Sequence, residues 1–363
     1  MNEPLHILCV FSTLDRGGAE TMCMNLYRNI DRDKVQFDFV KHTSLRGAYE
    51  DEIETLGGRV YEAPKYKLYN KASYKVWWRR FLNEHDEYRI IHGHYFTASS
   101  TYLKVAKIMG RHTIGHIHAS SFSDTFLGRI KTYETKRIAP VADTRFACSE
   151  VAGKWAYRNR KFTVLNNAVD SARFAFDPTR RAEMREQLHI GEDEKAIFVV
   201  ANLNEVKNPL GTLDIYSAIK RKNPNACLFW VGEGGMRGSI VEKITSDHIP
   251  NVRLLGARSD VAELLQAADA FMLCSYNEGL PVVTIEAQAS GLPCLLSSAI
   301  TTEADITGLC CFLSIDQPKV WVEAAENAFL ISRKDTRDEI IRAGYDIKET
   351  SAWLTNFYQN CVG

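Results

Sequence analysis

The chain has 363 residues, of which 45% are hydrophobic and 25% are charged. This length suits two domains of roughly 150–180 residues, and this composition is typical of a folded globular protein. The apolar runs are short, far from the ~20 residues that a membrane-spanning helix needs, and the first residues lack the basic start of a signal peptide. We therefore expect a cytoplasmic protein without a membrane span.

The net charge is zero, but the charges are unevenly distributed. Residues 1–170 hold 26 Lys and Arg against 19 Asp and Glu, and the excess is concentrated in residues 65–161, with 19 basic and 7 acidic side chains. A basic half suggests that this half meets an anionic ligand or surface. The nine cysteines form no Cys-x-x-Cys pair, so we expect free thiols in a reducing compartment rather than a disulfide framework.

Apolar, β-branched runs alternate with amphipathic helical stretches along the whole chain. In the first half the strand-like runs are residues 5–11, 35–40, 89–94, 112–118, 145–149 and 162–167. In the second half they are residues 196–201, 226–232, 252–256, 270–275, 293–297 and 310–315. Continuous apolar strands separated by helical crossovers predict parallel sheets that are covered on both faces. Six runs in each half favour two doubly wound, Rossmann-like α/β domains over a single larger one.

We place the two domains at residues 1–170 and 171–345, because the pattern pauses at Asn, Asp and Pro residues within 166–181. Residues 346–363 are amphipathic, and we expect them to form a helix that packs on the first domain. Open parallel sheets bind ligands beyond the carboxyl ends of their strands. The residues that follow strands are therefore the candidates for a site, which two facing sheets would form in a cleft.

Gly17 and Gly18 follow the first predicted strand and precede a helix that we expect from Ala19 to Asn29. Two glycines let backbone N–H groups approach an anion at a helix N-terminus, although an ordinary strand-to-helix turn explains them equally well. The spacing is not Gly-x-Gly-x-x-Gly, and no Gly-x-x-x-x-Gly-Lys-Ser/Thr motif is present. A nicotinamide dinucleotide fingerprint and a P-loop are therefore both missing.

The segment KYKLYNKASYKVWWRRF, residues 65–81, mixes six Lys and Arg residues with Trp77, Trp78 and several tyrosines. Basic residues with interfacial aromatics suit the surface of an anionic membrane. An ordinary helix with a solvated basic face and its tryptophans in the core is an equally good interpretation. No recognition motif supports a nucleic acid as partner.

Two His-x-His pairs end predicted strands: His92 with His94, and His116 with His118. Residues i and i+2 of a strand share a face, so four imidazoles near one site would be able to bind a metal. No carboxylate or cysteine lies at ligand spacing beside them. We therefore expect hydrogen-bonding groups at strand ends and no metal site.

In the second half, Lys207 lies in a turn after the strand at 196–201 and is a candidate phosphate ligand. A lone lysine is more often only a solvated charge. Asn208 is predicted to cap the next helix, with Pro209 as its first residue.

Glu278 follows the strand at 270–275, and a helix is expected from Pro281 to Ser290. The free amides around the start of this helix suit a phosphate or diphosphate. These amides belong to the stretch Gly279, Leu280, Pro281, Val282 and Val283. Glu286 lies further along the helix, so we expect the two acids to hold hydroxyl groups on either side of a diphosphate rather than to share a proton. A capping glutamate and a surface glutamate are the alternative.

Together these pieces resemble the retaining glycosyltransferases of family 4, which have the GT-B fold. More narrowly, the chain resembles the bacterial exopolysaccharide and capsule glycosyltransferases. The similar pieces are residues 17–20 (GGAE), 116–120 (HIHAS), 148–157 (CSEVAGKWAY), 166–170 (NNAVD), Lys207-Asn208, 231–235 (VGEGG), 254–261 (LLGARSDV), 277–298 (NEGLPVVTIEAQASGLPCLLSS) and 300–307 (ITTEADIT). The two glutamates in their Glu-Gly-Leu-Pro setting are the most specific of these pieces.

The resemblance implies that the second domain binds a nucleotide-sugar donor and the first binds an acceptor. Glu286 would hold the ribose hydroxyls, and Glu278 with the amides of residues 279–283 would hold the donor sugar and phosphates. Lys207 would neutralise the leaving diphosphate. The backbone near Arg258 would recognise the base.

For the first domain, the resemblance implies that His118 meets the donor sugar, with His116 as the alternative. Gly17 and Gly18 would cover the phosphates. Glu20, His94 and His116 would lie on the acceptor side. Of all these residues, Glu278, His118 and Lys207 would carry the catalysis.

The implied reaction moves a sugar from a nucleotide-diphosphate sugar, by family habit a UDP-sugar, to a hydroxyl of a glycan or lipid-linked acceptor, with the anomeric configuration kept. No cofactor or metal is expected, because protein cations would stabilise the leaving group. One departure weakens this expectation: the family usually has Arg five positions before the lysine, and this chain has Asn202. An epimerase or phosphorylase on the same fold and a non-catalytic nucleotide-binding member of a polysaccharide assembly complex remain alternatives.

Overall fold

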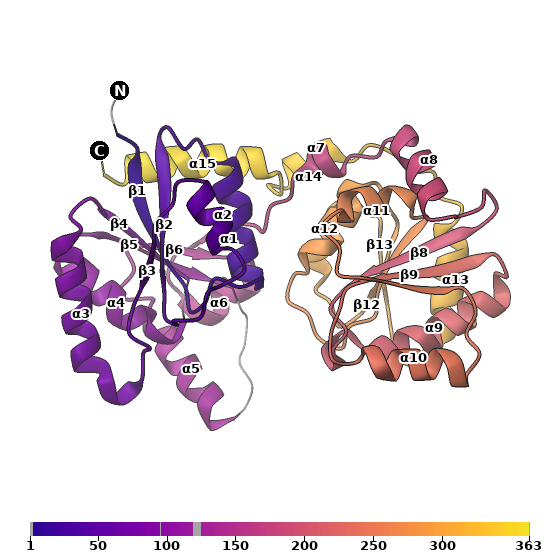
Figure 1. Cartoon of the computed structure of the whole chain (residues 1–363), viewed down its shortest axis with the longest axis horizontal. Coiled ribbons are helices and arrows are strands. Elements are labelled where there is room, and N and C mark those ends of the chain that lie inside the picture. The colour runs from indigo at the N-terminus through magenta and orange to yellow at the C-terminus, as the bar shows by residue number, and fades with distance from the viewer. Residues whose placement is uncertain (1–2, 95, 119–124, 363) are drawn as a thin grey trace. The chain divides into compact units, whose positions relative to one another are not determined.

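The computed structural model describes residues 3–94, 96–118 and 125–362. Its residues form two compact units (Figure 1): unit 1 comprises Met1–Ala168 with Ile347–Gly363, and unit 2 comprises Val169–Asp346. The boundaries expected from the sequence, after residues 170 and 345, lie within two residues of these divisions. The last two residues of the HIHAS stretch, Ala119 and Ser120, lie outside the described residues.

Unit 1 is built on a parallel sheet. Its strands are β1 (Leu5–Val10), β2 (Val35–Lys41), β3 (Val60–Glu62), β4 (Ile90–Gly93), β5 (His112–Ile117), β6 (Thr144–Ala147) and β7 (Thr163–Val164). Their order in the sheet is β3-β2-β1-β4-β5-β6-β7. Successive residues of β1 serve two different cores, because Ile7 and Cys9 face one side of the sheet and Leu8 and Val10 face the other.

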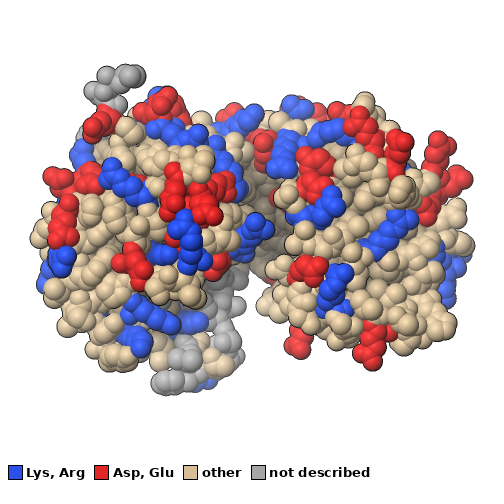
Figure 2. Space-filling model, viewed as in Figure 1, with Lys and Arg blue, Asp and Glu red and all other residues tan. Residues whose placement is uncertain are grey.

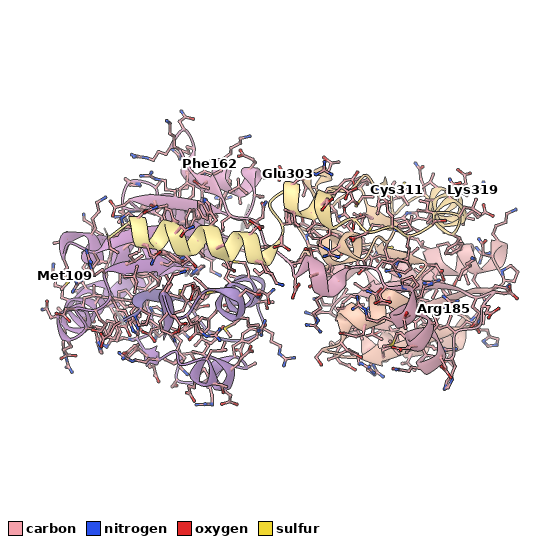
Figure 3. The ribbon with its side chains drawn as sticks, turned by 90° about the horizontal axis from the view of Figure 1, so that it is seen from above. Met109, Phe162, Arg185, Glu303, Cys311 and Lys319 are labelled. Atoms are coloured by element: carbon pink, nitrogen blue, oxygen red, sulfur yellow. The ribbon has the colours of Figure 1, made fainter. Side chains whose placement is uncertain are left out.

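Helices cover both faces of this sheet. They are α1 (Gly18–Asn29), α2 (Glu50–Thr55), the 3₁₀ turn η1 (Leu68–Asn70), α3 (Lys71–Glu84), α4 (Phe96–Ile108), α5 (Phe126–Lys136), α6 (Glu150–Tyr157) and α15 (Ile347–Asn360). The last of these comes from the far end of the chain and runs along unit 1 (Figures 1 and 3). Leu354 and Tyr358 of α15 are fully buried in the same core as Cys9, beside α1.

Unit 2 contains a second parallel sheet. Its strands are β8 (Lys195–Val200), β9 (Ala226–Val231), β10 (Val252–Gly256), β11 (Ala270–Leu273), β12 (Cys294–Ser297) and β13 (Cys310–Leu313). The order in the sheet is β10-β9-β8-β11-β12-β13, so the direction of winding reverses between β8 and β11. The all-apolar runs of the sequence become strands buried on both faces, such as β9, in which all six residues are buried.

The helices of unit 2 are mostly short. They are α7 (Ser171–Phe174), α8 (Pro178–Gln187), η2 (Glu205–Lys207), α9 (Pro209–Lys222), α10 (Arg237–Ser246), α11 (Val261–Ala267), α12 (Val282–Ala289), η3 (Thr302–Ala304), α13 (Pro318–Ala328) and α14 (Arg337–Arg342). Two parallel α/β sheets, one in each unit, confirm the predicted fold class.

The sequence pattern fails at the two edges of the unit 1 sheet. The edge strand β3 has three half-exposed or exposed residues and no continuous apolar run, so it was not predicted. The opposite edge strand β7 has two residues, although the apolar run at 162–167 predicts a longer strand. An edge strand has a neighbouring strand on one side only and is more exposed than a central strand. Its pattern of hydrophobic residues in the sequence is therefore weaker.

The surface of each unit carries mixed charge. Lys and Arg side chains are interspersed with Asp and Glu on the visible face (Figure 2). Some of the surface charges form exposed ion pairs, such as Arg28 with Glu52. The nine cysteines are free thiols, as expected, and six of them are buried. Among the described residues, no helix has both the length and the apolar character needed to cross a membrane.

Arg333 holds the C-terminal end of α12 in place. Its guanidinium donates to the carbonyl oxygen of Ser290, directly after α12, and to the carbonyl oxygens of Leu265, Gln266 and Ala268 at the end of α11. Burial lowers the pKa of this guanidinium to about 9. One planar donor group therefore joins the carbonyl groups of two helix ends, where intrahelical hydrogen bonding is incomplete.

Arg333→Lys is expected to lower the free energy of unfolding by about 1–3 kcal/mol, because an ammonium group cannot bridge the Ser290 carbonyl, which accepts from Nε and Nη2 of Arg333, to the carbonyls of α11. Arg337→Lys is the matched control, since Arg337 is exposed and paired with Asp335 at the surface. Urea denaturation followed by tryptophan fluorescence measures both variants. Equal losses in the two variants would contradict the role given to Arg333.

Candidate functional site

Two charged side chains meet at the carboxyl edge of the unit 2 sheet. Lys207, at the end of η2 after β8, forms an ion pair with Glu278, which follows β11. The two strands are neighbours only because the strand order reverses between them. Such a reversal is the place where open α/β sheets bind ligands. Both side chains are largely buried, with 21% of Lys207 and 15% of Glu278 exposed, so the pair is shielded from bulk water.

The loops that carry this pair are joined by hydrogen bonds. The Ser275 hydroxyl donates to Oε1 of Glu278 over 2.9 Å. The backbone amide of Tyr276 donates to the carbonyl oxygen of Val206 over 2.8 Å. The carboxylate therefore has a neutral donor as well as a cation, and the loop after β11 is fastened to the turn that carries the lysine.

Asn208 begins the next helix, as the sequence predicts. Its backbone is left-handed (φ 52°, ψ 53°), its side chain accepts a hydrogen bond from the Gly211 amide, and Pro209 is the first helical residue. The side-chain amide nitrogen of Asn208 also donates to the carbonyl oxygen of Cys274 over 3.2 Å. The cap thus connects the turn after β8 to the end of β11.

The N-terminus of α12 lies four residues after Glu278 in the chain. The helix begins at Val282, one residue later than expected, because Pro281 has an extended backbone (ψ 119°) and occupies the capping position. No side chain caps this end. A Cβ atom added to Gly279 would meet no atom within 4 Å, so the space beside it is open. First-turn amides and the positive end of the helix dipole favour an anion here.

Glu286 lies in the second turn of α12, and its side chain is partly exposed. Burial raises the pKa of its carboxyl group to about 7, and the guanidinium of Arg173 offsets part of this rise. The carboxylate and the carboxylic acid are therefore both populated at neutral pH. A carboxylate in this position accepts hydrogen bonds from hydroxyl groups, whereas the acid accepts fewer.

Arg173 on α7 was not singled out from the sequence. Its guanidinium lies within 3.5 Å of the Ser259 carbonyl oxygen and of the Glu263 carboxylate, and it acts on Glu286 electrostatically. The residue belongs to a stretch interpreted as a domain boundary, and no motif marks it. Ser275 was missed for the same reason, since a serine at a strand end has no distinctive spacing.

Arg258 follows β10, two strands away from β8 in the sheet. Its side chain is 41% exposed and is paired with Asp260, with Nε 2.7 Å from Oδ1. The side chain is therefore engaged locally. The family resemblance implies that the backbone near Arg258, and not its side chain, recognises the base. In this backbone, the carbonyl oxygen of the neighbouring Ser259 lies near Arg173.

Asn202 is exposed in the loop after β8. The loop after β9 packs tightly against it: the Leu203 amide donates to the Glu233 carbonyl oxygen over 3.0 Å. Gly232 has φ 145°, and a Cβ there would collide with the carbonyl oxygen of Ala201. A Cβ on Gly234 would likewise collide with the carbonyl oxygen of Leu203, so the close approach explains two of the three glycines of VGEGG. Position 202 is thus held firmly by the loop after β9, but Asn202 brings no positive charge to it.

In unit 1, α1 begins at Gly18, directly after Gly17, and no side chain caps it. The space beside Gly18 is open, whereas a Cβ on Gly17 would collide with the carboxylate of Glu20. Burial raises the pKa of Glu20, and Asp15 adds to the rise. The structure therefore brings these predicted residues together at one helix start, with the Glu20 carboxylate lying over Gly17.

Four histidines gather at the carboxyl ends of β4 and β5. The ring centres of His92 and His94 are 4.2 Å apart, and those of His116 and His118 are 4.1 Å apart. Nδ1 of His94 lies 2.8 Å from Nε2 of His118. The prediction that the two pairs share one face is confirmed.

These histidines differ in exposure. His92, His94 and His116 are at most 4% exposed, whereas His118 is partly exposed. Burial lowers the pKa of His92 and of His118 to about 3, and burial with repulsion from the neighbouring rings lowers the pKa of His94 and His116 strongly. The rings are therefore neutral at physiological pH. Of His116 and His118, it is His118 that a ligand of unit 1 can reach.

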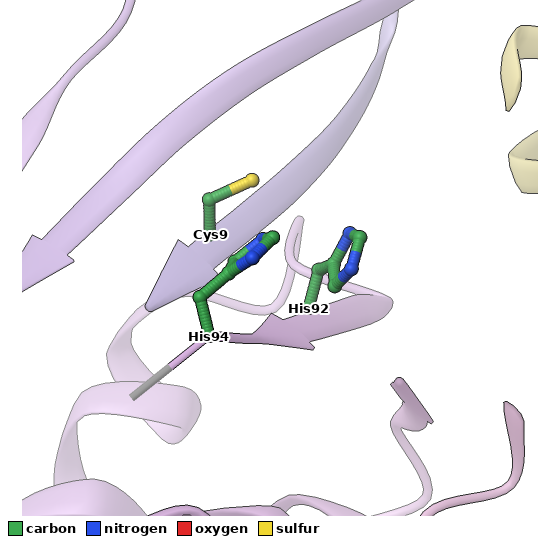
Figure 4. Close-up of side chains that lie close together, drawn as sticks. All are labelled: Cys9, His92 and His94. Atoms are coloured by element: carbon green, nitrogen blue, oxygen red, sulfur yellow. The ribbon is translucent and has the colours of Figure 1, made fainter. Parts of the chain in front are cut away.

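One expectation about these histidines is wrong. Sequence spacing shows no cysteine beside them, but Cys9 of β1 is the register partner of His92 of β4. The ligand atoms of Cys9, His92 and His94 lie within 4.8 Å of one another (Figure 4), as do those of His94, His116 and His118. Cys9 is brought beside His92 by the pairing of β1 with β4, and the spacing of residues in the sequence cannot reveal such a contact.

The basic segment at 65–81 forms η1 and most of α3. Four of its aromatic residues are buried: Tyr66, Tyr74, Trp78 and Phe81. Trp77 is partly buried and stacks on Phe81 with ring centres 5.0 Å apart. These aromatics belong to the core, as the simpler interpretation held. The exposed part of the segment is basic, together with Tyr69 at 82% and Val76 at 61% exposure.

The chain matches two known protein families. "Glycosyltransferase Family 4" matches residues 16–173, and "Glycosyl transferases group 1" matches residues 180–310. The first match covers most of unit 1 with its glycine pair and four histidines. The second covers the part of unit 2 that carries Lys207, Glu278 and Glu286.

Similar proteins cover almost the whole chain. A putative glycosyltransferase of Bacillus subtilis, EpsF, is 32% identical over 97% of this chain and 96% of its own length. The capsular polysaccharide biosynthesis glycosyltransferase CapH of Staphylococcus aureus is 22% identical over 98% of this chain and 99% of its own. The crystal structure of HepE from Anabaena, in complex with UDP and glucose, superposes with a TM-score of 0.76 at 16% identity, over 97% of this chain and 99% of that chain. The chain belongs to the glycosyltransferases of family 4 and has their GT-B fold.

Proposed function

We propose that this glycosyltransferase moves a sugar from a UDP-sugar to a hydroxyl of a glycan or lipid-linked acceptor, in the synthesis of a bacterial surface polysaccharide. The observation that carries the proposal is the Lys207–Glu278 pair at the switch point of the unit 2 sheet, just before an uncapped helix. The capsular role in the name of CapH and the UDP and glucose bound by HepE support the pathway and the nucleotide.

In this proposal the donor binds to unit 2. The diphosphate meets the first amides of α12 and Lys207, which together stabilise the charge of the leaving group. The sugar hydroxyls meet Glu278, and the ribose hydroxyls meet Glu286. Lys207 and Glu278 are paired with each other, and the donor would offer each of them a further partner of suitable charge. The ion pair thus keeps both groups in place beside the proposed donor.

The transfer step itself keeps the anomeric configuration. The acceptor hydroxyl attacks on the face from which the diphosphate leaves, the bond from the anomeric carbon to the phosphate oxygen breaks, and the departing phosphate takes up the hydroxyl proton. Lys207 and the helix dipole supply the positive charge that a metal would otherwise provide. We assign His118 to the donor sugar, Gly17 and Gly18 to the phosphates, and Glu20 with His94 to the acceptor.

Asn202 favours a second candidate function. Without an arginine at this position, the site has one fewer cation for the diphosphate, and a protein that binds UDP without transferring sugar would have this composition. The two candidates differ in turnover and not in binding. Under the second candidate, Asn202→Arg would gain transfer activity that the natural chain lacks.

The proposal includes a peripheral contact with an anionic membrane through the exposed side chains of residues 65–81. With its aromatics mostly in the core, this contact rests on Lys65, Lys67, Arg79 and Arg80, with Tyr69 beside them. Each basic residue near an anionic surface contributes about 1 kcal/mol at most. Flotation with anionic vesicles at low salt measures this contact. The protein should rise with the vesicles, and should stay behind at high salt; no co-flotation at low salt would remove this part of the proposal.

Glu278→Gln is expected to lower the rate of sugar transfer by roughly 10²-fold or more, because a carboxylate aimed at the reacting sugar is lost. UDP lacks the sugar, so its binding should be kept or strengthened, since a negative charge beside the diphosphate disappears. Transfer is measured as UDP release from UDP-sugars in the presence of acceptor, and UDP binding by calorimetry. Glu323→Gln, an exposed change on α13, is the control. Full transfer by Glu278→Gln would refute the role given to this residue.

A further inference from the structure

We propose that unit 1 binds a Zn²⁺ ion between Cys9, His92 and His94, with His116 beside the fourth position. This inference goes beyond the proposed sugar transfer and does not depend on it, since none of the transfer chemistry uses the ion. It assigns a role to buried side chains, of which Cys9 and His92 have no part in the proposed transfer.

The three ligands are placed by the sheet. Cys9 of β1 and His92 of β4 are directly paired across two neighbouring parallel strands. His94 lies two residues after His92, on the same face. Their ligand atoms are all within 4.8 Å of one another (Figure 4). Ligands of a tetrahedral zinc ion lie roughly 3.3–3.7 Å apart, given about 2.0–2.1 Å to nitrogen and about 2.3 Å to sulfur, so small side-chain movements would complete the site.

The free nitrogens point to a ligand. Nε2 of His92, Nε2 of His94 and both ring nitrogens of His116 are buried without a hydrogen-bond partner among the described residues. Buried polar atoms in native proteins nearly always have a partner, and each exception needs an explanation. Several such atoms from neighbouring strands, with a thiol among them, are explained together by a single bound cation.

The other ring nitrogens already have partners. Nδ1 of His92 lies 2.7 Å from the Tyr358 hydroxyl of α15, and Nδ1 of His94 lies 2.8 Å from Nε2 of His118. Metal-binding histidines usually donate their second N–H to such an acceptor, which fixes the ring and leaves the other nitrogen free to coordinate. This arrangement is present before any ion binds.

The chemistry of the ligand atoms indicates which metal would bind. Two imidazoles and a thiolate suit zinc, and three protein ligands leave a fourth position. The His116 ring lies beside it, with centres 5.4 Å from His92 and 5.2 Å from His94. On binding, the S–H bond of Cys9 breaks as the bond from sulfur to zinc forms, and the proton leaves to solvent.

The ion would join three parts of unit 1. Cys9 lies on β1, the two histidines lie on and after β4, and Tyr358 connects His92 to α15. Through His94 the ion would also hold His118, the exposed histidine of the group. Zinc would therefore brace the end of the sheet on which the acceptor side is proposed.

The test uses the full chain without an affinity tag, stripped by a chelator. Zn²⁺ is titrated against a coloured competitor, and Co²⁺ is added as a spectroscopic probe. One equivalent of each ion should bind, and the cobalt form should show a thiolate-to-metal charge-transfer band. Cys9→Ser should lose this band and bind zinc more than about 100-fold more weakly, beyond the about 10–100-fold that loss of an outer partner causes. Cys227→Ser, a buried thiol of β9 in unit 2, should change neither.

Absence of stoichiometric zinc binding, or a cobalt band that survives Cys9→Ser, would overturn the proposal. If Cys9→Ser does not fold, X-ray absorption of the zinc-loaded natural chain replaces it. One sulfur and two or three imidazole nitrogens around zinc would support the site. A shell of nitrogen and oxygen alone would refute it.

Discussion

The ion pair of Lys207 and Glu278 is the contact on which the site of unit 2 depends. The two residues are far apart in the sequence, and each stands in a loop that would be mobile alone. They meet because β8 and β11 are neighbours where the strand order reverses. Ser275, Asn208 and the link from Tyr276 to Val206 then fasten the two loops together. The pair keeps a basic and an acidic side chain together and largely shielded from water.

The helix that follows adds what a pair of side chains lacks. α12 offers amides without partners and the positive end of its dipole, and Pro281 excludes a competing side-chain cap. At its other end, Arg333 ties the Ser290 carbonyl after α12 to the carbonyls of Leu265 and Gln266 in the last turn of α11. A rigid helix positioned in this way stabilises negative charge without reorganising during the reaction, which is the most effective form of electrostatic catalysis. In the proposed function, Glu286 one turn further along would thus have a fixed distance from a diphosphate bound at the start of α12.

Much of this was predictable from the sequence, and the physical reasons for success and failure differ. Buried strands of a parallel sheet have continuous apolar runs, so two α/β domains and most strands were expected, and Asn208 and Pro209 gave a local signal that the structure confirms. Edge strands such as β3 are half-exposed and gave none. Contacts made by sheet pairing or helix packing, such as Cys9 beside His92 and Arg173 near Glu286, join residues whose spacing in the chain carries no information. The aromatic residues of 65–81 show a further limit, because composition alone does not tell which side of a helix faces the core.

The effect of UDP on thermal stability, in the natural chain and in Glu286→Gln at pH 8 and pH 6, tests the central claim most directly. A ligand that binds only the folded protein raises its melting temperature by mass action. The pKa of Glu286 is raised to about 7, so its carboxylate is present above that pH and is lost below it. UDP should therefore stabilise the natural chain more at pH 8 than at pH 6. In Glu286→Gln the shift at pH 8 should shrink, and only the weaker pH dependence of the phosphate itself should remain. No stabilisation of the folded natural chain by UDP, or identical shifts in both proteins at both pH values, would contradict the account.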